Sequence, residues 1–151
     1  MNQAEEFISQ WRDTLEKGAL LHFSHGPRRE HTGNHCQIAD GFVTGQGMKP
    51  IGFNWELLDA GAPEGERRSG IGELVNALTH DLANPSHAWL PIGQARDCAK
   101  AFLSLFDLAN LTLVSNRFDG LWNPIAGGAV EWGFLGYDHD QVALLLLASE
   151  T

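Results

Sequence analysis

The stretch Glu131–Ala148, EWGFLGYDHDQVALLLLA, decides the fold. Its first part belongs to a run from Ala129 to Tyr137 in which apolar side chains alternate with glutamate or glycine, and this alternation is typical of a strand. The run Gln141–Ser149 is almost entirely aliphatic, which predicts a strand that is covered on both faces. Between the two runs, Asp138-His139-Asp140 is rich in turn-forming residues and predicts a three-residue hairpin connection.

A third apolar run, Leu111–Ser115, precedes this hairpin and predicts a further short strand. We therefore expect residues 111–149 to form a C-terminal sheet. The segment between the runs carries Phe118, Leu121 and Trp122 next to carboxylates, and it is expected to be a long loop.

Three amphipathic helices are expected to pack on this sheet. Residues 4–17 place apolar side chains at steps of three and four, which is the helical period. A second helix is predicted over about residues 70–84, where Ser69 can cap its first turn. A third is predicted over about residues 94–108, with Cys98 in its apolar stripe.

The region 18–70 has a different character, because it is rich in glycine and histidine and lacks sustained helical periodicity. Loops and short strands are expected to dominate it. Gln37–Thr44 and Ile51–Leu58 are the better strand candidates, and residues 59–70 are expected to be an exposed loop because they are polar, glycine-rich and charged with both signs.

These patterns together predict an α+β fold for residues 1–151 as a single domain. The chain length and a hydrophobic content of 43% suit one hydrophobic core that needs no disulfide or metal ion to stabilise it. We expect about three helices on a mainly antiparallel sheet, arranged as a single pair of layers with a C-terminal β-hairpin.

The net charge of −9 argues against direct binding to nucleic acid or to an anionic membrane. Cations pair only at Arg28-Arg29 and Arg67-Arg68, and each pair has a glutamate beside it. No basic flank with an apolar segment opens the chain, and no apolar run approaches the roughly 20 residues that a bilayer span requires. With two cysteines, the chain is expected to be cytoplasmic, in a reducing compartment.

Four histidines and one cysteine fall between residues 22 and 36. A metal site is one interpretation of this cluster, with His22, His25, His31 and His35 as ligands. The spacing matches no metal signature, and Arg28 and Arg29 between the pairs would repel a cation. A solvated loop is the competing interpretation.

A small hydrolase or metal-dependent enzyme is the alternative function that this cluster offers. Cys36 would be the nucleophile, with His31 or His35 as its base. A reactive cysteine commonly lies at a helix N-terminus, and the residues after Cys36 do not show a helical pattern. The usual catalytic and phosphate-binding motifs are missing from the sequence, so the balance is against an enzyme and no cofactor is expected.

The C-terminal sheet offers a candidate surface for binding another protein. Aromatic side chains beside carboxylates have the composition of such a surface, because a buried aromatic anchor gives affinity and charge steers the encounter. The competing interpretation is that Trp122 folds back onto the sheet. The candidate residues are Asp119, Trp122, Glu131, Asp138 and Asp140.

A small, acidic, α+β chain without catalytic motifs has the profile of a protein that binds another protein. Bacterial immunity proteins and other inhibitors, which neutralise toxic enzymes by covering their active sites, share these bulk properties; this analogy rests on size and charge alone. We therefore expect an immunity or inhibitor protein with a basic partner, a toxin or other enzyme. A secretion chaperone or structural subunit is a further alternative, with a possible homodimer through Phe7 and Trp11.

Overall fold

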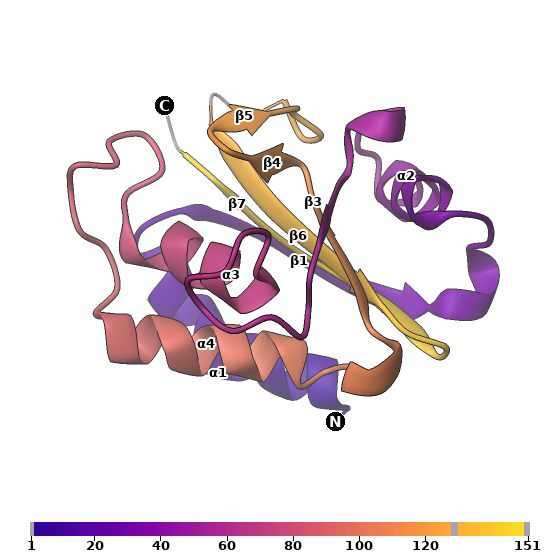
Figure 1. Cartoon of the computed structure of the whole chain (residues 1–151), viewed down its shortest axis with the longest axis horizontal. Coiled ribbons are helices and arrows are strands. Elements are labelled where there is room, and N and C mark those ends of the chain that lie inside the picture. Colours follow the sequence, from indigo (N-terminus) through magenta and orange to yellow (C-terminus); the bar gives the residue numbers. More distant parts are fainter. Residues whose placement is uncertain (1, 128–129, 150–151) are drawn as a thin grey trace.

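The computed structural model describes residues 2–127 and 130–149, and these form an α+β fold in which helices pack on an antiparallel sheet (Figure 1). The helical elements are α1 (Gln3–Glu16), η1 (Arg28–Glu30), α2 (His35–Gly45), η2 (Gly52–Asn54), α3 (Gly70–Thr79), α4 (Ile92–Leu103) and η3 (Leu108–Asn110), where η denotes a 3-10 turn. The strands are β1 (Leu20–Pro27), β2 (Glu56–Leu58), β3 (Thr112–Ser115), β4 (Arg117–Phe118), β5 (Leu121–Trp122), β6 (Glu131–Tyr137) and β7 (Gln141–Ala148).

The C-terminal hairpin lies inside the main sheet, whose strand order is β1-β7-β6-β3-β2 with every neighbouring pair antiparallel. Residues 138–140 connect β6 to β7, which confirms the expected three-residue connection. β4 and β5 form a separate two-stranded hairpin. The sequence run that began at Ala129 is a strand from Glu131, and Ala129 itself lies outside the described residues.

Strand β7 is buried on both faces, as its unbroken aliphatic sequence predicts. Successive side chains of a strand point to opposite faces, so the strand contributes to two cores. Ala143, Leu145 and Leu147 pack with α1, α3 and α4, whereas Leu144 and Leu146 pack with α2. The molecule therefore has three layers rather than the expected single pair, because α2 covers the second face of the sheet (Figure 1).

Helix α1 begins at an Asn2 cap, whose side-chain oxygen accepts a hydrogen bond from the Glu5 backbone N–H at 2.8 Å. Its apolar face is buried against the sheet, and both Phe7 and Trp11 belong to the core. These two side chains are therefore not available as the dimer contact that the sequence suggested as an alternative.

Helix α2 overturns the prediction that Gln37–Thr44 is a strand. Asn34 and Gln37 form a reciprocal capping box: the Asn34 side chain accepts from the Gln37 N–H, and the Gln37 side chain accepts from the Asn34 N–H, both at 2.9 Å. Ile38, Ala39 and Phe42 are then buried on one face of the helix. The capping box and the buried apolar face stabilise the helix more than Gly41 and Gly45 destabilise it.

The glycine-rich region also contains the sheet's longest edge strand, β1, which the sequence pattern did not predict. In the candidate Ile51–Leu58, only the last three residues are a strand, because η2 occupies residues 52–54. The expected helices over about 70–84 and 94–108 are confirmed, and both end early, at Thr79 and Leu103.

No helix among the described residues combines the length and the apolar content that crossing a bilayer requires.

Candidate functional site

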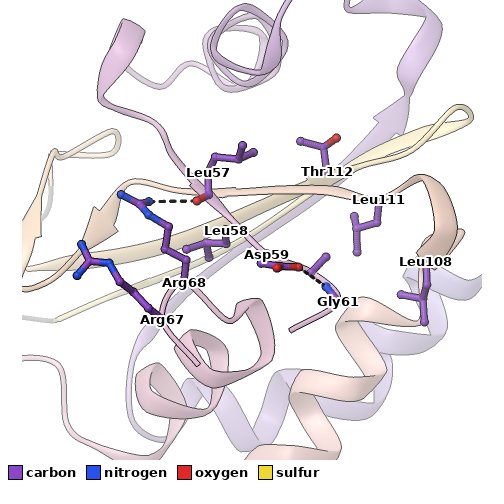
Figure 2. Close-up of a pocket in the computed structure, with 10 residues that line it drawn as sticks. Leu57, Leu58, Asp59, Gly61, Arg67, Arg68, Leu108, Leu111 and Thr112 are labelled. Atoms are coloured by element: carbon purple, nitrogen blue, oxygen red, sulfur yellow. Dashed lines mark hydrogen bonds between the residues drawn. The ribbon is translucent and has the colours of Figure 1, made fainter. Parts of the chain in front are cut away.

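A cleft of about 570 Å³ lies along the edge strand β2 (Figure 2). Its apolar part comes from β2 and from the segment around η3, where Leu57 and Leu108 are 47% and 61% exposed. Its polar part comes from the segment that follows β2. The lining residues are Leu57, Leu58, Asp59, Ala60, Gly61, Arg67, Arg68, Leu108, Leu111 and Thr112.

Arg68 closes one end of this cleft by binding the exposed edge of β2. Its Nη1 donates to the Leu57 carbonyl oxygen at 3.1 Å (Figure 2). The same Nη1 donates to Glu56 Oε2, also at 3.1 Å. Its own carbonyl accepts from the Asp59 N–H at 2.7 Å. The Arg68 backbone has φ +64°, a left-handed conformation that is uncommon for a residue with a side chain. These bonds hold the arginine against the strand edge.

Arg67 connects the cleft to the β4–β5 hairpin. Its guanidinium lies 3.7 Å from the Asp119 carboxylate, and both side chains are largely exposed. Phe118 holds both arginines by cation–π contact, with Arg67 at 5.3 Å and Arg68 at 4.2 Å from the ring centroid. A second hollow of about 410 Å³ lies here, between the start of α3 and the hairpin.

The β4–β5 hairpin turns through Asp119 and Gly120, whose φ angles are +54° and +79°. Two consecutive positive φ values define the type I′ turn that suits a two-residue hairpin. Directly after the turn, Leu121 is 78% exposed, and Trp122 is half-buried. The segment expected as a long loop is therefore a tight hairpin that presents an aliphatic side chain to solvent.

Glu131 and Asp138 have structural roles in the described chain. The Glu131 side chain is completely buried, and its carboxylate accepts hydrogen bonds from the backbone N–H groups of Ile125 at 2.8 Å and Ala126 at 3.0 Å. Burial raises the pKa of the Asp138 carboxyl, but three backbone hydrogen bonds, from Asp107, Asp140 and Gln141, outweigh it and hold that pKa below its usual value. Neither carboxylate is presented to a partner.

The structure does not bring the five predicted partner-binding residues together. Asp119 and Trp122 belong to the β4–β5 hairpin, which lies near the start of β6, and Glu131 is the first residue of β6 (Figure 1). Asp138 and Asp140 follow the last residue of β6, Tyr137. The seven residues of β6 separate these ends by roughly 20 Å at the usual rise of a strand. Only Asp119 and Trp122 share one exposed surface.

The histidines of residues 22–36 lie on different elements. His22 and His25 are in β1, where a spacing of three places their side chains on opposite faces of the sheet. His35 begins α2, and the His31 ring packs edge-on against Phe42. Among residues 2–127 and 130–149, no group of three or more His, Cys, Asp or Glu side chains lies close enough to hold a metal ion.

Cys36 does stand in the first turn of a helix, the context that the sequence seemed to lack. Its thiol is nevertheless not activated. The side chain is buried, and burial raises the pKa of the thiol, with the nearby Asp40 carboxylate raising it further. The other thiol, Cys98, is more deeply buried, and burial raises its pKa to about 12.

Sequence reasoning missed the contacts between arginines and aromatic rings in and around the hairpin. Arg117 stacks at 4.2 Å on the Trp132 ring, and burial lowers the pKa of its guanidinium while Glu73 opposes that shift. Partial burial also raises the pKa of the Glu73 carboxyl, with Asp119 adding to the rise. The Arg67-Arg68 pair was visible in the sequence, but the ring that both arginines contact, Phe118, comes from the distant strand β4.

Comparison of the chain with protein-family models, with curated proteins and with solved structures finds no match.

Proposed function

We propose that this chain is a protein-binding protein of the immunity or inhibitor class, which covers the active site of a basic, toxic enzyme. Its contact surface is the β4–β5 hairpin with the residues that support it, called here the hairpin surface. The members of this surface are Arg67, Asp119, Leu121 and Trp122.

The observation that carries the proposal is the exposure of Leu121, the first residue after a tight two-residue turn. A leucine that is 78% exposed leaves most of its apolar area in water, and burying a leucine side chain is worth about 1.5–3 kcal/mol. The type I′ turn fixes this residue before binding, so little conformational entropy is lost when a partner covers it. The half-buried Trp122 beside it supplies a second anchor of the type that dominates protein interfaces.

Charge supports a basic partner. The chain carries a net charge of −9, which speeds the encounter with a cationic protein and makes the association sensitive to salt. Asp119 is 68% exposed in its ion pair with Arg67, so this carboxylate can exchange Arg67 for a cation of the partner at little cost.

We place this activity in the cytoplasm. Both cysteines are free and buried in the described structure, which suits a compartment where thiols stay reduced. Fractionation of the native cells tests this placement, and recovery of the protein outside the cytoplasmic fraction would overturn it.

The test of function is affinity capture from the native cell extract, followed by calorimetry with the purified captured protein. Leu121→Asp removes the proposed anchor, and Ile92→Asp is the matched control because Ile92 is also an exposed apolar residue, 54% exposed at the start of α4. We expect the wild type and Ile92→Asp to capture the same basic enzyme and to inhibit it, and Leu121→Asp to bind it at least about tenfold more weakly.

The salt dependence gives a second, independent readout. Affinity is expected to fall steeply as ionic strength rises, because the encounter is electrostatically steered. Equal capture by Leu121→Asp and the wild type would show that the hairpin surface is not the contact. A captured protein that is acidic, or that keeps its activity in the complex, would overturn the inhibitor proposal.

A further inference from the structure

A hollow of about 300 Å³ lies between α3, the turn that follows it, and the strands β4 and β6. Its apolar wall consists of Leu82, Pro85 and the ring of Trp132. Ligand pockets usually measure about 300–1,000 Å³, so this hollow is small and suits a molecule of the size of a single amino acid. It shares no residue with the hairpin surface or with the cleft along β2.

Arg117 lines this hollow and has an unused hydrogen-bonding edge. Its guanidinium lies over the Trp132 ring, 4.2 Å from the ring centroid, so one flat face is occupied and the edge is not. Among the described residues, its side chain donates no hydrogen bond and forms no ion pair, and none of its nitrogen atoms is sealed from solvent. Glu73 on α3 acts on it electrostatically but does not pair with it. A guanidinium held in this way is suited to bind a carboxylate through two parallel hydrogen bonds.

The carboxylate of Asp81 lines the same hollow. Its Oδ1 accepts hydrogen bonds from the backbone N–H groups of Ala83 and Asn84, each at 2.9 Å. The Asp81 N–H donates to the His87 carbonyl at 2.9 Å, which closes the turn on itself. Within the described chain, the second oxygen, Oδ2, accepts no hydrogen bond. The hollow therefore contains a positioned carboxylate with one free oxygen, which can accept from an ammonium group.

Opposite charges in one small hollow select a ligand that carries both. A simple anion would be repelled by Asp81 and Glu73, and a simple cation would be repelled by Arg117. A zwitterion pairs with both walls, and its zero net charge is not opposed by the acidic chain. The remaining titratable residue of the wall, His80, has its Nδ1 occupied by the Thr79 hydroxyl at 2.9 Å.

We propose that this hollow binds a free amino acid with an apolar side chain. The α-carboxylate pairs with the Arg117 guanidinium, and the α-ammonium group pairs with the Asp81 carboxylate. The side chain of the ligand packs against the apolar wall. Because none of these contacts uses the hairpin surface, the site stands or falls independently of the proposed inhibitor function.

The test is calorimetric titration of the full chain with L-leucine. Two control ligands keep the leucine side chain and lack one charge each: isocaproate lacks the ammonium group, and isoamylamine lacks the carboxylate. We expect leucine to bind at least about tenfold more tightly than either, because each control leaves one charged wall unpaired. NMR spectra of the isotope-labelled chain locate the site, and leucine is expected to shift the Arg117 Nε–H and the amides of residues 80–85.

Two variants separate the charged contacts from the fold. Arg117→Gln removes the guanidinium and is expected to weaken leucine binding by about tenfold or more. Asp81→Asn keeps the oxygen that accepts from the turn and removes the charge, so it should weaken leucine binding similarly while isocaproate binds no more weakly than before. The matched controls, Arg12→Gln and Asp13→Asn at exposed positions on α1, should change neither affinity. Circular dichroism verifies folding of each variant.

Several results would exclude this site. Absence of leucine binding at about 10 mM shows that the hollow takes no free amino acid of this kind. Equal affinity for leucine and isocaproate would assign the hollow to simple carboxylates instead. Binding that survives Asp81→Asn unchanged, or NMR shifts confined to other segments, would contradict the assigned contacts even if Arg117→Gln failed to fold.

Discussion

The side-chain carboxylate of Asp40 in α2 accepts a hydrogen bond from the Trp55 indole Nε1 at 2.8 Å. The same carboxylate accepts from the backbone N–H groups of Ile51 and Gly52, each at 2.9 Å. One helix residue therefore fixes the whole turn that leads into β2. This anchoring explains how Phe53, which is 93% exposed, is held at the tip of a 3-10 turn.

Removing this carboxylate should destabilise the protein. Asp40→Ala deletes three hydrogen bonds to a charged acceptor, each worth about 1.5–3 kcal/mol alone, and because such losses are not additive we expect a decrease of about 2–4 kcal/mol in the free energy of unfolding. Urea unfolding monitored by tryptophan fluorescence measures it. Asp13→Ala, at an exposed position on α1, is the control and should change stability by less than about 0.5 kcal/mol. Equal stability of the two variants would contradict the anchoring role.

The sequence predicted the fold best where one local pattern determines the structure. The aliphatic run of β7 and the turn residues before it suffice to define the hairpin, because burial on both faces leaves no polar alternation. Helix α2 shows the opposite case. Its signal was the capping box of Asn34 and Gln37, which was readable in the sequence, but the surrounding glycines favoured the strand interpretation.

The candidate site was less predictable, because its contacts join distant segments. Glu131 looked like a solvent-facing residue of an alternating strand, yet its partners are backbone amides of residues 125 and 126, which leave no trace in side-chain type. Likewise, the sequence cannot show that Phe118 receives both Arg67 and Arg68. Of the predicted partner-binding residues, only Asp119 and Trp122 lie on one surface, because they are close in the sequence and share one hairpin.

Asp138 should make stability depend on pH in the acid range. Its folded-state pKa lies below the ordinary 3.8, so its contribution is fully present well above pH 3.8 and is lost as the pH falls through 3.8 towards the lower folded-state pKa. Asp138→Asn should therefore lower the free energy of unfolding by about 1–3 kcal/mol at pH 7 and by much less at pH 3. Urea unfolding at both pH values tests this, with the exposed Asp140→Asn as control. A difference from wild type that stays constant with pH would refute the assignment.

The two thiols should be inert in the folded protein. Burial raises the pKa of both cysteines, that of Cys98 to about 12, so little thiolate exists near neutral pH. We expect Ellman's reagent to label neither cysteine at pH 7.5 over minutes and to label both after unfolding in urea. Cys36→Ser and Cys98→Ser assign any signal to one position. Rapid native-state labelling of Cys36 would revive the interpretation of this residue as a nucleophile.

Gly136 in β6 should not tolerate a side chain. A Cβ atom there would lie 2.8 Å from Cζ of Phe106, whose ring is buried and packs edge-on against Phe102. The ring must move out of a filled core, so Gly136→Ala is expected to lower the free energy of unfolding by about 1–3 kcal/mol. Gly93→Ala is the matched control, because a Cβ in that helix meets no atom within 4 Å, and it should stabilise the protein by about 0.5–1 kcal/mol. Thermal and urea unfolding of both variants measure these opposite effects, and a neutral or stabilising Gly136→Ala would mean that the Phe106 ring does not rest on this glycine.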